Sequence, residues 1–67
     1  DVLHVRADQK IKRVIIYSLT GFAVRELLFA GQTEVTVQAM DLAEGNYIVT
    51  IELQDGSVKN ERLMITR

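Results

Sequence analysis

Apolar and polar residues alternate along most of this chain with a period close to two. The alternation is longest from Asn46 to Leu53, where every second side chain is apolar. The apolar positions of this segment are Tyr47, Val49, Ile51 and Leu53. Because successive side chains of a strand point to opposite faces, we expect the segment to be the longest strand, with that face in the core.

Shorter segments with the same pattern predict four further strands. These are Val2–Val5, Arg13–Tyr17, Thr33–Gln38 and Val58–Thr66. The segments from Arg6 to Lys12 and from Met40 to Glu44 are expected to form turns. A third turn is expected from Leu19 to Gly21, because the glycine is free to adopt a positive φ.

The segment from Phe22 to Ala30, FAVRELLFA, fits either a helix or a strand. It contains good helix formers, and Val24, Leu27 and Leu28 lie at helical spacing. Only nine residues separate the flanking glycines, which is short for a helix. A strand is therefore the preferred prediction.

The Asp55-Gly56 pair predicts a tight turn between the last two strands. A two-residue loop would place Val49 opposite Arg62, whereas a three-residue loop from Asp55 to Ser57 would place it opposite Leu63. A shift of one residue turns every side chain to the other face of the sheet. Pairing of apolar side chains favours the three-residue loop, with its glycine in or near the left-handed region.

Six short strands separated by turns at intervals of about 8 to 12 residues indicate an all-β fold. There is no β-α-β pattern, so we expect an immunoglobulin-like antiparallel β-sandwich of six to seven short strands. The chain has no proline to protect its edge strands. Charged residues are expected to protect them instead, namely Lys12, Arg13, Glu34 and Lys59.

Composition limits the size and the class of the protein. The 67 residues suffice for one small domain, and 48% hydrophobic with 25% charged residues is typical of a globular one. A net charge of -1 gives no reason to expect nucleic acid or an anionic membrane as a partner. No apolar run approaches the roughly 20 residues of a membrane helix. Because the chain begins with Asp1 rather than Met, we expect it to be cut from a longer protein.

No group of residues has the composition of an active site or a metal site. His4 is the only histidine and there is no cysteine, so it is expected to face solvent. Asp41 and Glu44 are too few for a calcium loop and are expected to be turn residues. Ser18 and Ser57 lie in no nucleophile pattern. We therefore expect no enzyme and no cofactor.

Three motifs together resemble a known family. VIIYSLTGFAV is similar to Val-x-Ile-Tyr-x-Leu-x-Gly-x-x-Val, and LAEGNYIVTI is similar to Leu-x-x-Gly-x-Tyr-x-Val-x-Ile. The matching positions are Val14, Ile16, Tyr17, Leu19, Gly21 and Val24, then Leu42, Gly45, Tyr47, Val49 and Ile51. DGSVKNERLMITR is similar to a closing hairpin in which a basic residue precedes an apolar pair. The chain thus resembles the type A C-terminal sorting domain of the type IX secretion system of Bacteroidetes-type bacteria.

The resemblance covers nearly the whole chain and implies one sorting domain, residues 1–67. DVLHV looks like the strand that follows the Pro-Asn-Pro motif of the family, which is missing here. The chain departs from the usual family residues at Phe22, Met40 and Asn46. The turn and motif residues that the resemblance singles out are Tyr17, Gly21, Gly45, Tyr47, Asp55 and Gly56.

The resemblance also implies a function. Such a domain labels a cargo protein that precedes it, passes through the periplasm, and is recognised by an outer-membrane translocon. A sortase-like protease then typically removes it and couples the cargo to a lipopolysaccharide at the cell surface. The domain itself catalyses nothing and binds no cofactor.

The last strand is the expected recognition element, through Arg62, Leu63, Ile65 and Arg67. An exposed edge strand can pair with a strand of a partner, and the two arginines can orient the encounter by charge. The same edge can pair two copies into a homodimer. The alternative is that Leu63 and Ile65 belong to the core and that only the basic residues meet the partner.

A second functional class is also compatible with the sequence. A generic immunoglobulin-like or fibronectin-like module would serve as a spacer or an adhesion domain in a surface protein, since many sandwiches share an architecture without sharing a function. A sorting domain must be the last element of its precursor, whereas a spacer can lie anywhere.

Overall fold

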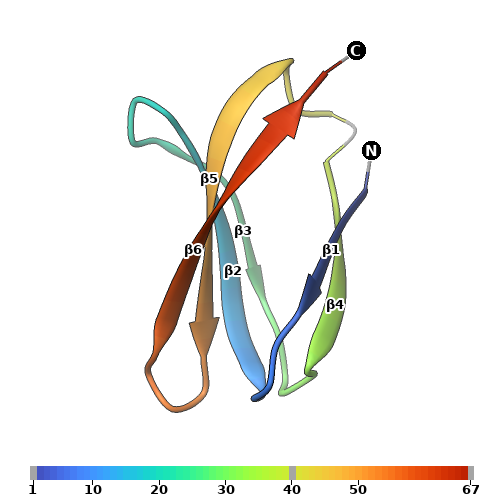
Figure 1. Cartoon of the computed structure of the whole chain (residues 1–67), viewed down its shortest axis with the longest axis vertical. Helices are drawn as coiled ribbons and strands as arrows, with labels where there is room; N and C mark the ends of the chain where they lie inside the picture. The colour runs from blue at the N-terminus through green and yellow to red at the C-terminus, as the bar shows by residue number, and fades with distance from the viewer. Residues whose placement is uncertain (1, 40, 67) are drawn as a thin grey trace.

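Six β-strands form the regular structure of the chain, which a computed structural model describes over residues 2–39 and 41–66 (Figure 1). The strands are β1 (Val2–Arg6), β2 (Ile11–Ser18), β3 (Ala23–Leu28), β4 (Glu34–Gln38), β5 (Gly45–Leu53) and β6 (Val58–Ile65). The described residues contain no helix. The all-β prediction is confirmed.

The strands form two antiparallel sheets that pack face to face. One sheet pairs β1 with β4, and the other has the order β3-β2-β5-β6. In Figure 1 the two-stranded sheet stands beside the larger one, with β6 and β1 towards the viewer and β3 behind. This is the predicted immunoglobulin-like sandwich, with six strands in the described chain.

One hydrophobic cluster joins the two sheets. In β5 the predicted apolar face is buried, with Tyr47, Val49, Ile51 and Leu53 all at most 7% exposed. Val14 and Ile16 of β2 are fully buried beside them, and the small sheet contributes Val5, Val35 and Val37. Full burial of one such side chain stabilises the fold by roughly 1.5–3 kcal/mol, so this face accounts for much of the stability.

The ambiguous segment is a strand, as preferred, but a shorter one. β3 begins at Ala23 and ends at Leu28 rather than extending from Phe22 to Ala30. Its pairing with β2 shifts register between Ile16 and Tyr17, which is the signature of a β-bulge. Backbone pairing with a strongly apolar neighbour therefore overrides the helical spacing of the segment.

The predicted register of the last hairpin is wrong by two residues. Tyr47, not Val49, lies opposite Leu63, and Val49 lies opposite Glu61. Leu53 N donates to Ser57 O (2.9 Å), which closes a three-residue loop, Gln54–Gly56, one residue earlier than predicted. The glycine of this loop has φ +91°, as expected for a type I turn followed by a left-handed residue. Because the error is an even number of residues, every side chain keeps its predicted face.

The other strand boundaries differ from the prediction by at most two residues. The expected turn from Arg6 to Lys12 is shorter, because β1 includes Arg6 and β2 begins at Ile11. Arg6 extends β1 on the solvent face, where it lies opposite Glu34. Ile11 extends β2 at its start and is fully buried. Met40, at the start of the next expected turn, lies outside the described residues, whereas Asp41 is in a turn as predicted.

Four of the described strands are sheet edges, namely β1, β4, β3 and β6. Two of the residues expected to protect edges, Lys12 and Arg13, lie instead on β2, which is paired on both sides. Glu34 and Lys59 do lie on edge strands. The sequence alone could not show this difference because it depends on strand order.

Candidate functional site

The first two sequence motifs and the last strand come together at one end of the four-stranded sheet. Ser18 at the end of β2 lies opposite Tyr47 near the start of β5, and Tyr47 lies opposite Leu63 near the end of β6. Gly45 pairs with Ile65 at the same end. We call this region, defined by Ser18, Tyr47 and Leu63, the motif end of the sheet.

The turn of the first motif is closed by backbone and hydroxyl groups. Gly21 N donates to Ser18 O (3.0 Å), and Ser18 N donates to Phe22 O (2.8 Å). The hydroxyls of Ser18 and Thr20 are 2.9 Å apart. Gly21 has φ +95°, a conformation that favours glycine, so the predicted role of this residue is confirmed. The tyrosine that precedes the turn, Tyr17, is half-buried on the outer face of the sheet.

The second motif builds a tyrosine corner. The hydroxyl of Tyr47 donates to the carbonyl of Ala43, four residues upstream, at 2.5 Å. Leu42, the first residue of the motif, is buried in the core. Immunoglobulin-like domains fix the approach to a central strand with the same bond. Tyr47 is only 7% exposed, so its role is to hold the corner rather than to contact a partner.

The Asp55-Gly56 turn lies at the opposite end of the sheet. Asp55 Oδ1 accepts bonds from Ser57 N (2.9 Å) and from Ser57 Oγ (2.6 Å). The two bonds lower the pKa of the Asp55 carboxyl, and the bond from the Ser57 hydroxyl has the larger effect. The turn therefore sets the hairpin and is distant from the motif end.

The four predicted recognition residues fall into different environments. Ile65 is 2% exposed and belongs to the core, and Leu63 is half-buried against it. Arg62 is exposed on the outer face of the sheet, opposite Ile48. Arg67 lies outside the described residues.

The backbone of β6 has one free side. Among the described residues β6 pairs only with β5, and this pairing runs from Val58 to Ile65 without a bulge. Since Leu53 and Ser57 form a hydrogen-bonded pair, the alternation of an antiparallel ladder directs the N–H and C=O groups of the odd-numbered residues of β6 towards β5. The even-numbered residues, Val58, Asn60, Arg62 and Met64, direct theirs outwards.

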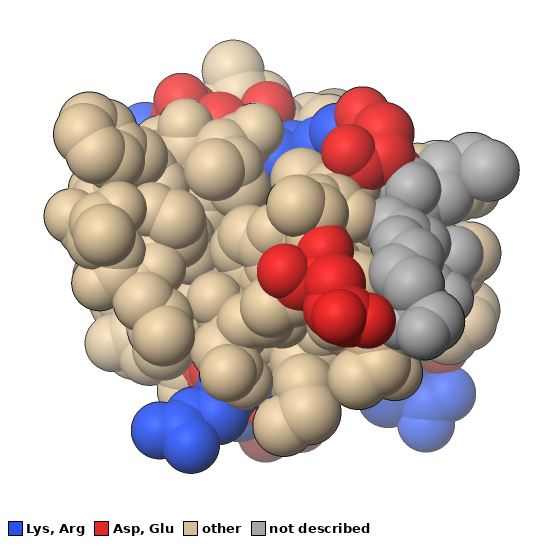
Figure 2. Space-filling model, turned by 90° about the horizontal axis from the view of Figure 1, so that it is seen from above, with Lys and Arg blue, Asp and Glu red and all other residues tan. Residues whose placement is uncertain are grey.

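The motif end also exposes apolar side chains that are outside the core. Leu19 is 65% exposed, Phe22 72% and Met64 64%. Figure 2 shows the molecule from this end, and uncharged atoms cover most of the left side, over which the β2–β3 turn lies in Figure 1. Phe22 thus adds to an exposed apolar surface.

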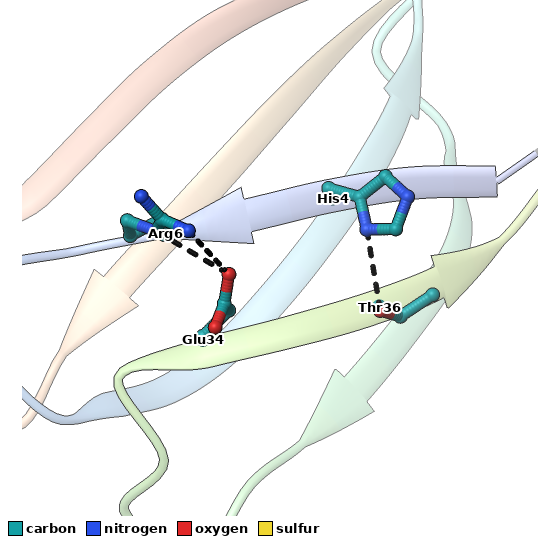
Figure 3. Close-up of polar contacts among 4 residues, drawn as sticks. All are labelled: His4, Arg6, Glu34 and Thr36. Carbon is teal, nitrogen blue, oxygen red and sulfur yellow. Dashed lines mark hydrogen bonds and ion pairs between the residues drawn. The ribbon is translucent and has the colours of Figure 1, made fainter.

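The outer face of the two-stranded sheet, β1 and β4, is polar. On the outer side of the small sheet, both Nε and Nη2 of Arg6 donate to Glu34 Oε2, at 3.3 and 2.9 Å (Figure 3). His4 Nδ1 lies 3.4 Å from the hydroxyl of Thr36 on the same face. His4 is exposed, as predicted. These cross-strand pairs are polar and exposed to solvent.

Two ionic clusters were not foreseen from the sequence. Arg13 joins three strands, since Nη1 donates to Glu26 Oε2 (3.1 Å) and Nη2 lies 2.9 Å from Glu52 Oε1. Both contacts raise the pKa of the Arg13 guanidinium, and the hydrogen bond to Glu26 has the largest effect. Arg25 of β3 binds Asp41, so the predicted turn residue also accepts a bond from the other sheet.

The described chain contains neither a metal-binding cluster nor a pocket. Among residues 2–39 and 41–66 no group of three or more His, Cys, Asp or Glu side chains could hold a metal ion, and no pocket is present. The described residues contain no helix that is long and apolar enough to cross a membrane. The features that remain are an open strand edge and an apolar end.

Comparison with known proteins gives one match. The family model described as "Secretion system C-terminal sorting domain" matches residues 1–66. No curated protein and no solved structure is similar enough to count as a match.

Proposed function

Because the chain belongs to the family of secretion system C-terminal sorting domains, we propose that the secretion machinery reads it through the free edge of β6 at the motif end. The family provides the C-terminal sorting signal of type IX secretion. The chain is therefore a sorting signal, and its family is not one of known enzymes. A sorting signal of this type implies a preceding cargo domain and export to the cell surface or the extracellular space.

The observation that carries the proposal is the exposed ladder of β6. β6 is paired on one side only, with β5, so its outward N–H and C=O groups have no strand partner in the described chain. Addition of a partner strand to such an edge gives affinity through main-chain bonds and specificity through alternate side chains. A sorting signal shared by many cargoes needs a surface of this kind, because main-chain bonds do not depend on the cargo.

The proposed recognition residues have different roles, because some are buried and others are exposed. Ile65 and Leu63 anchor β6 to the core, so they present the edge rather than contact the partner. Arg62 is exposed beside the edge and supplies a charge that speeds and orients the encounter. We assign the same role to Arg67. Exposed Leu19, Phe22 and Met64 add apolar area at the motif end, as protein interaction sites commonly do.

The partners follow from the family. We propose that residues 1–67 act as one domain, that the domain folds in the periplasm behind its cargo, and that the outer-membrane translocon binds it first. A sortase-like protease then removes it at the surface. The alternative function, an immunoglobulin-like spacer, has no observation in its favour.

A reporter tests the function. A periplasmic reporter enzyme is fused to the N-terminus of the chain and expressed in a bacterium with a type IX system, with the reporter alone as the control. The fusion is expected at the cell surface or in the medium, and the reporter alone in the periplasm. A fusion that stays in the periplasm, or that is exported equally in a strain without the translocon, would contradict the function.

A further inference from the structure

The lower half of β6, next to the hairpin turn, carries an unusual pair of charges. Lys59 and Glu61 lie opposite Ile51 and Val49, so they share the face of the sheet that the core uses. Both are exposed, and no ion pair joins either of them to another residue of the described chain. Inward-pointing charges at an edge normally prevent pairing with other strands.

We propose that this edge selects a second copy of the chain, which pairs its own β6 antiparallel about a two-fold axis at Asn60. A two-fold axis perpendicular to the sheet keeps the core faces of both copies on one side. In the register centred on Asn60, Lys59 of each copy lies opposite Glu61 of the other. Both pairs then join opposite charges.

The backbone geometry fits the same register. Val58, Asn60 and Arg62 direct their N–H and C=O groups outwards, so Asn60 pairs with Asn60 and Val58 with Arg62 through main-chain hydrogen bonds. Lys59 and Glu61 then form the intervening pairs without hydrogen bonds, whose Cα atoms approach to about 4.5 Å. Their side chains are in the closest of the cross-strand positions.

Neighbouring registers lack this complementarity. An axis at Glu61 places two glutamates opposite each other, an axis at Arg62 places two arginines, and an axis at Leu63 places Glu61 opposite the buried Ile65. Like charges opposite each other are destabilising. Charge complementarity therefore specifies both the partner, a second copy, and the register.

The other edges of the described chain offer less. β1 and β4 have 5 residues each, against 8 for β6. β3 contains the bulge, and its Arg25 is already bound by Asp41 and by the Gln38 carbonyl. β6 is thus the longest regular edge.

Self-pairing has a consequence for sorting that rests on the proposed function. A dimer would cover the lower half of the edge that the secretion machinery is proposed to read. Only the monomer would then offer the whole strand to a partner, so high local concentration would oppose recognition.

Charge-swap variants of the 67-residue chain test the pairing by sedimentation over a concentration series up to millimolar. The single variants Lys59→Glu and Glu61→Lys are each expected to weaken self-association about tenfold or more, because both pairs become repulsive. An equimolar mixture of the two variants, and the double variant Lys59→Glu/Glu61→Lys, are expected to associate like the unmodified chain. Both substituted positions, Lys59 and Glu61, are exposed, and circular dichroism checks the fold of each variant.

A monomer at every concentration would overturn the proposal, as would a dimer whose stability does not respond to these substitutions. The register is tested by oxidation of Asn60→Cys, since the chain has no other cysteine. This variant is expected to form a disulfide-linked dimer, because opposed Cα atoms of a hydrogen-bonded pair are about 5.5 Å apart. Ser57→Cys is the control, with its two sulfurs about 20 Å apart in this register. Equal cross-linking of both variants would exclude the register. These measurements involve no secretion machinery, so they fail or succeed independently of the proposed function.

Discussion

Arg25 of β3 and Asp41, which follows β4 in the chain, form a close ion pair that joins the two sheets. Arg25 Nη2 lies 2.6 Å from Oδ1 and 2.5 Å from Oδ2 of Asp41, while Nη1 donates to the carbonyl of Gln38 (2.9 Å). One side chain thus connects the edge of the large sheet to the end of the small one. In a domain of this size, which buries only about 60% of its unfolded surface, such a contact is a notable part of the stability.

Replacement of Arg25 by Met is expected to lower the free energy of unfolding by about 1–2 kcal/mol, because it removes charge-assisted bonds to partners on the other sheet. The Arg25 side chain is 24% exposed, but that of Asp41 is 64% exposed, so screening by water places the loss at the lower end of this range. Urea denaturation measures the loss. The matched control is Arg6→Met, whose ion pair with Glu34 is 81% and 62% exposed, and no measurable loss is expected there. Equal effects of the two substitutions would contradict the role assigned to Arg25.

The tyrosine corner predicts that the hydroxyl of Tyr47 matters more than that of Tyr17. Tyr47→Phe removes the bond to the Ala43 carbonyl and is expected to cost about 1 kcal/mol. Tyr17 is half-buried and its hydroxyl makes no hydrogen bond in the described chain, so Tyr17→Phe is expected to change stability by less than about 0.5 kcal/mol. Thermal unfolding of both variants measures the difference. A larger loss from Tyr17→Phe would reverse the assignment.

The lowered pKa of Asp55 predicts that the stability of the domain decreases as the pH falls in the acid range. The folded state lowers the pKa of this carboxyl below its ordinary value of 3.8 through the Ser57 bonds. A lowered folded pKa adds stability above the unfolded pKa, and that stability is lost as pH falls through the folded pKa. Ser57→Ala is therefore expected to destabilise the chain at neutral pH, and the difference from the unmodified chain should vanish at strongly acid pH. Thermal midpoints across the acid range, with an NMR titration of Asp55, measure it. A difference that persists below the folded pKa would contradict the linkage.

The faces of the strands followed from the sequence more reliably than their partners did. The alternation of Tyr47, Val49 and Ile51 identified the buried face, because period two is set by the strand itself. The register of β6 was wrong because the Asp55-Gly56 pair is compatible with loops of several lengths. Its even error preserved the burial of Ile65 and the exposure of Arg62.

Contacts between distant segments were not visible in the sequence. No local pattern indicates that Arg25 meets Asp41, because their proximity depends on how the two sheets stack. The inward position of Lys59 and Glu61 could have been found, since both have the same parity as Leu63 and Ile65. Their significance depends on β6 being an edge, which only the strand order shows.

The most direct test of the central claim, that the free edge of β6 is read by the secretion machinery, is the exported fraction of the reporter fusion carrying Met64→Pro. Proline removes the outward N–H of residue 64 without removing a bond to β5, and prolines are tolerated on the solvent side of an edge strand. Met64→Ala is the matched control, because it removes the same exposed side chain and keeps the N–H. Alanine is expected to lower export only by the loss of the exposed Met64 side chain, and proline is expected to lower it severalfold further, both variants having the thermal midpoint of the unmodified domain. Full export of a folded proline variant would contradict the claim.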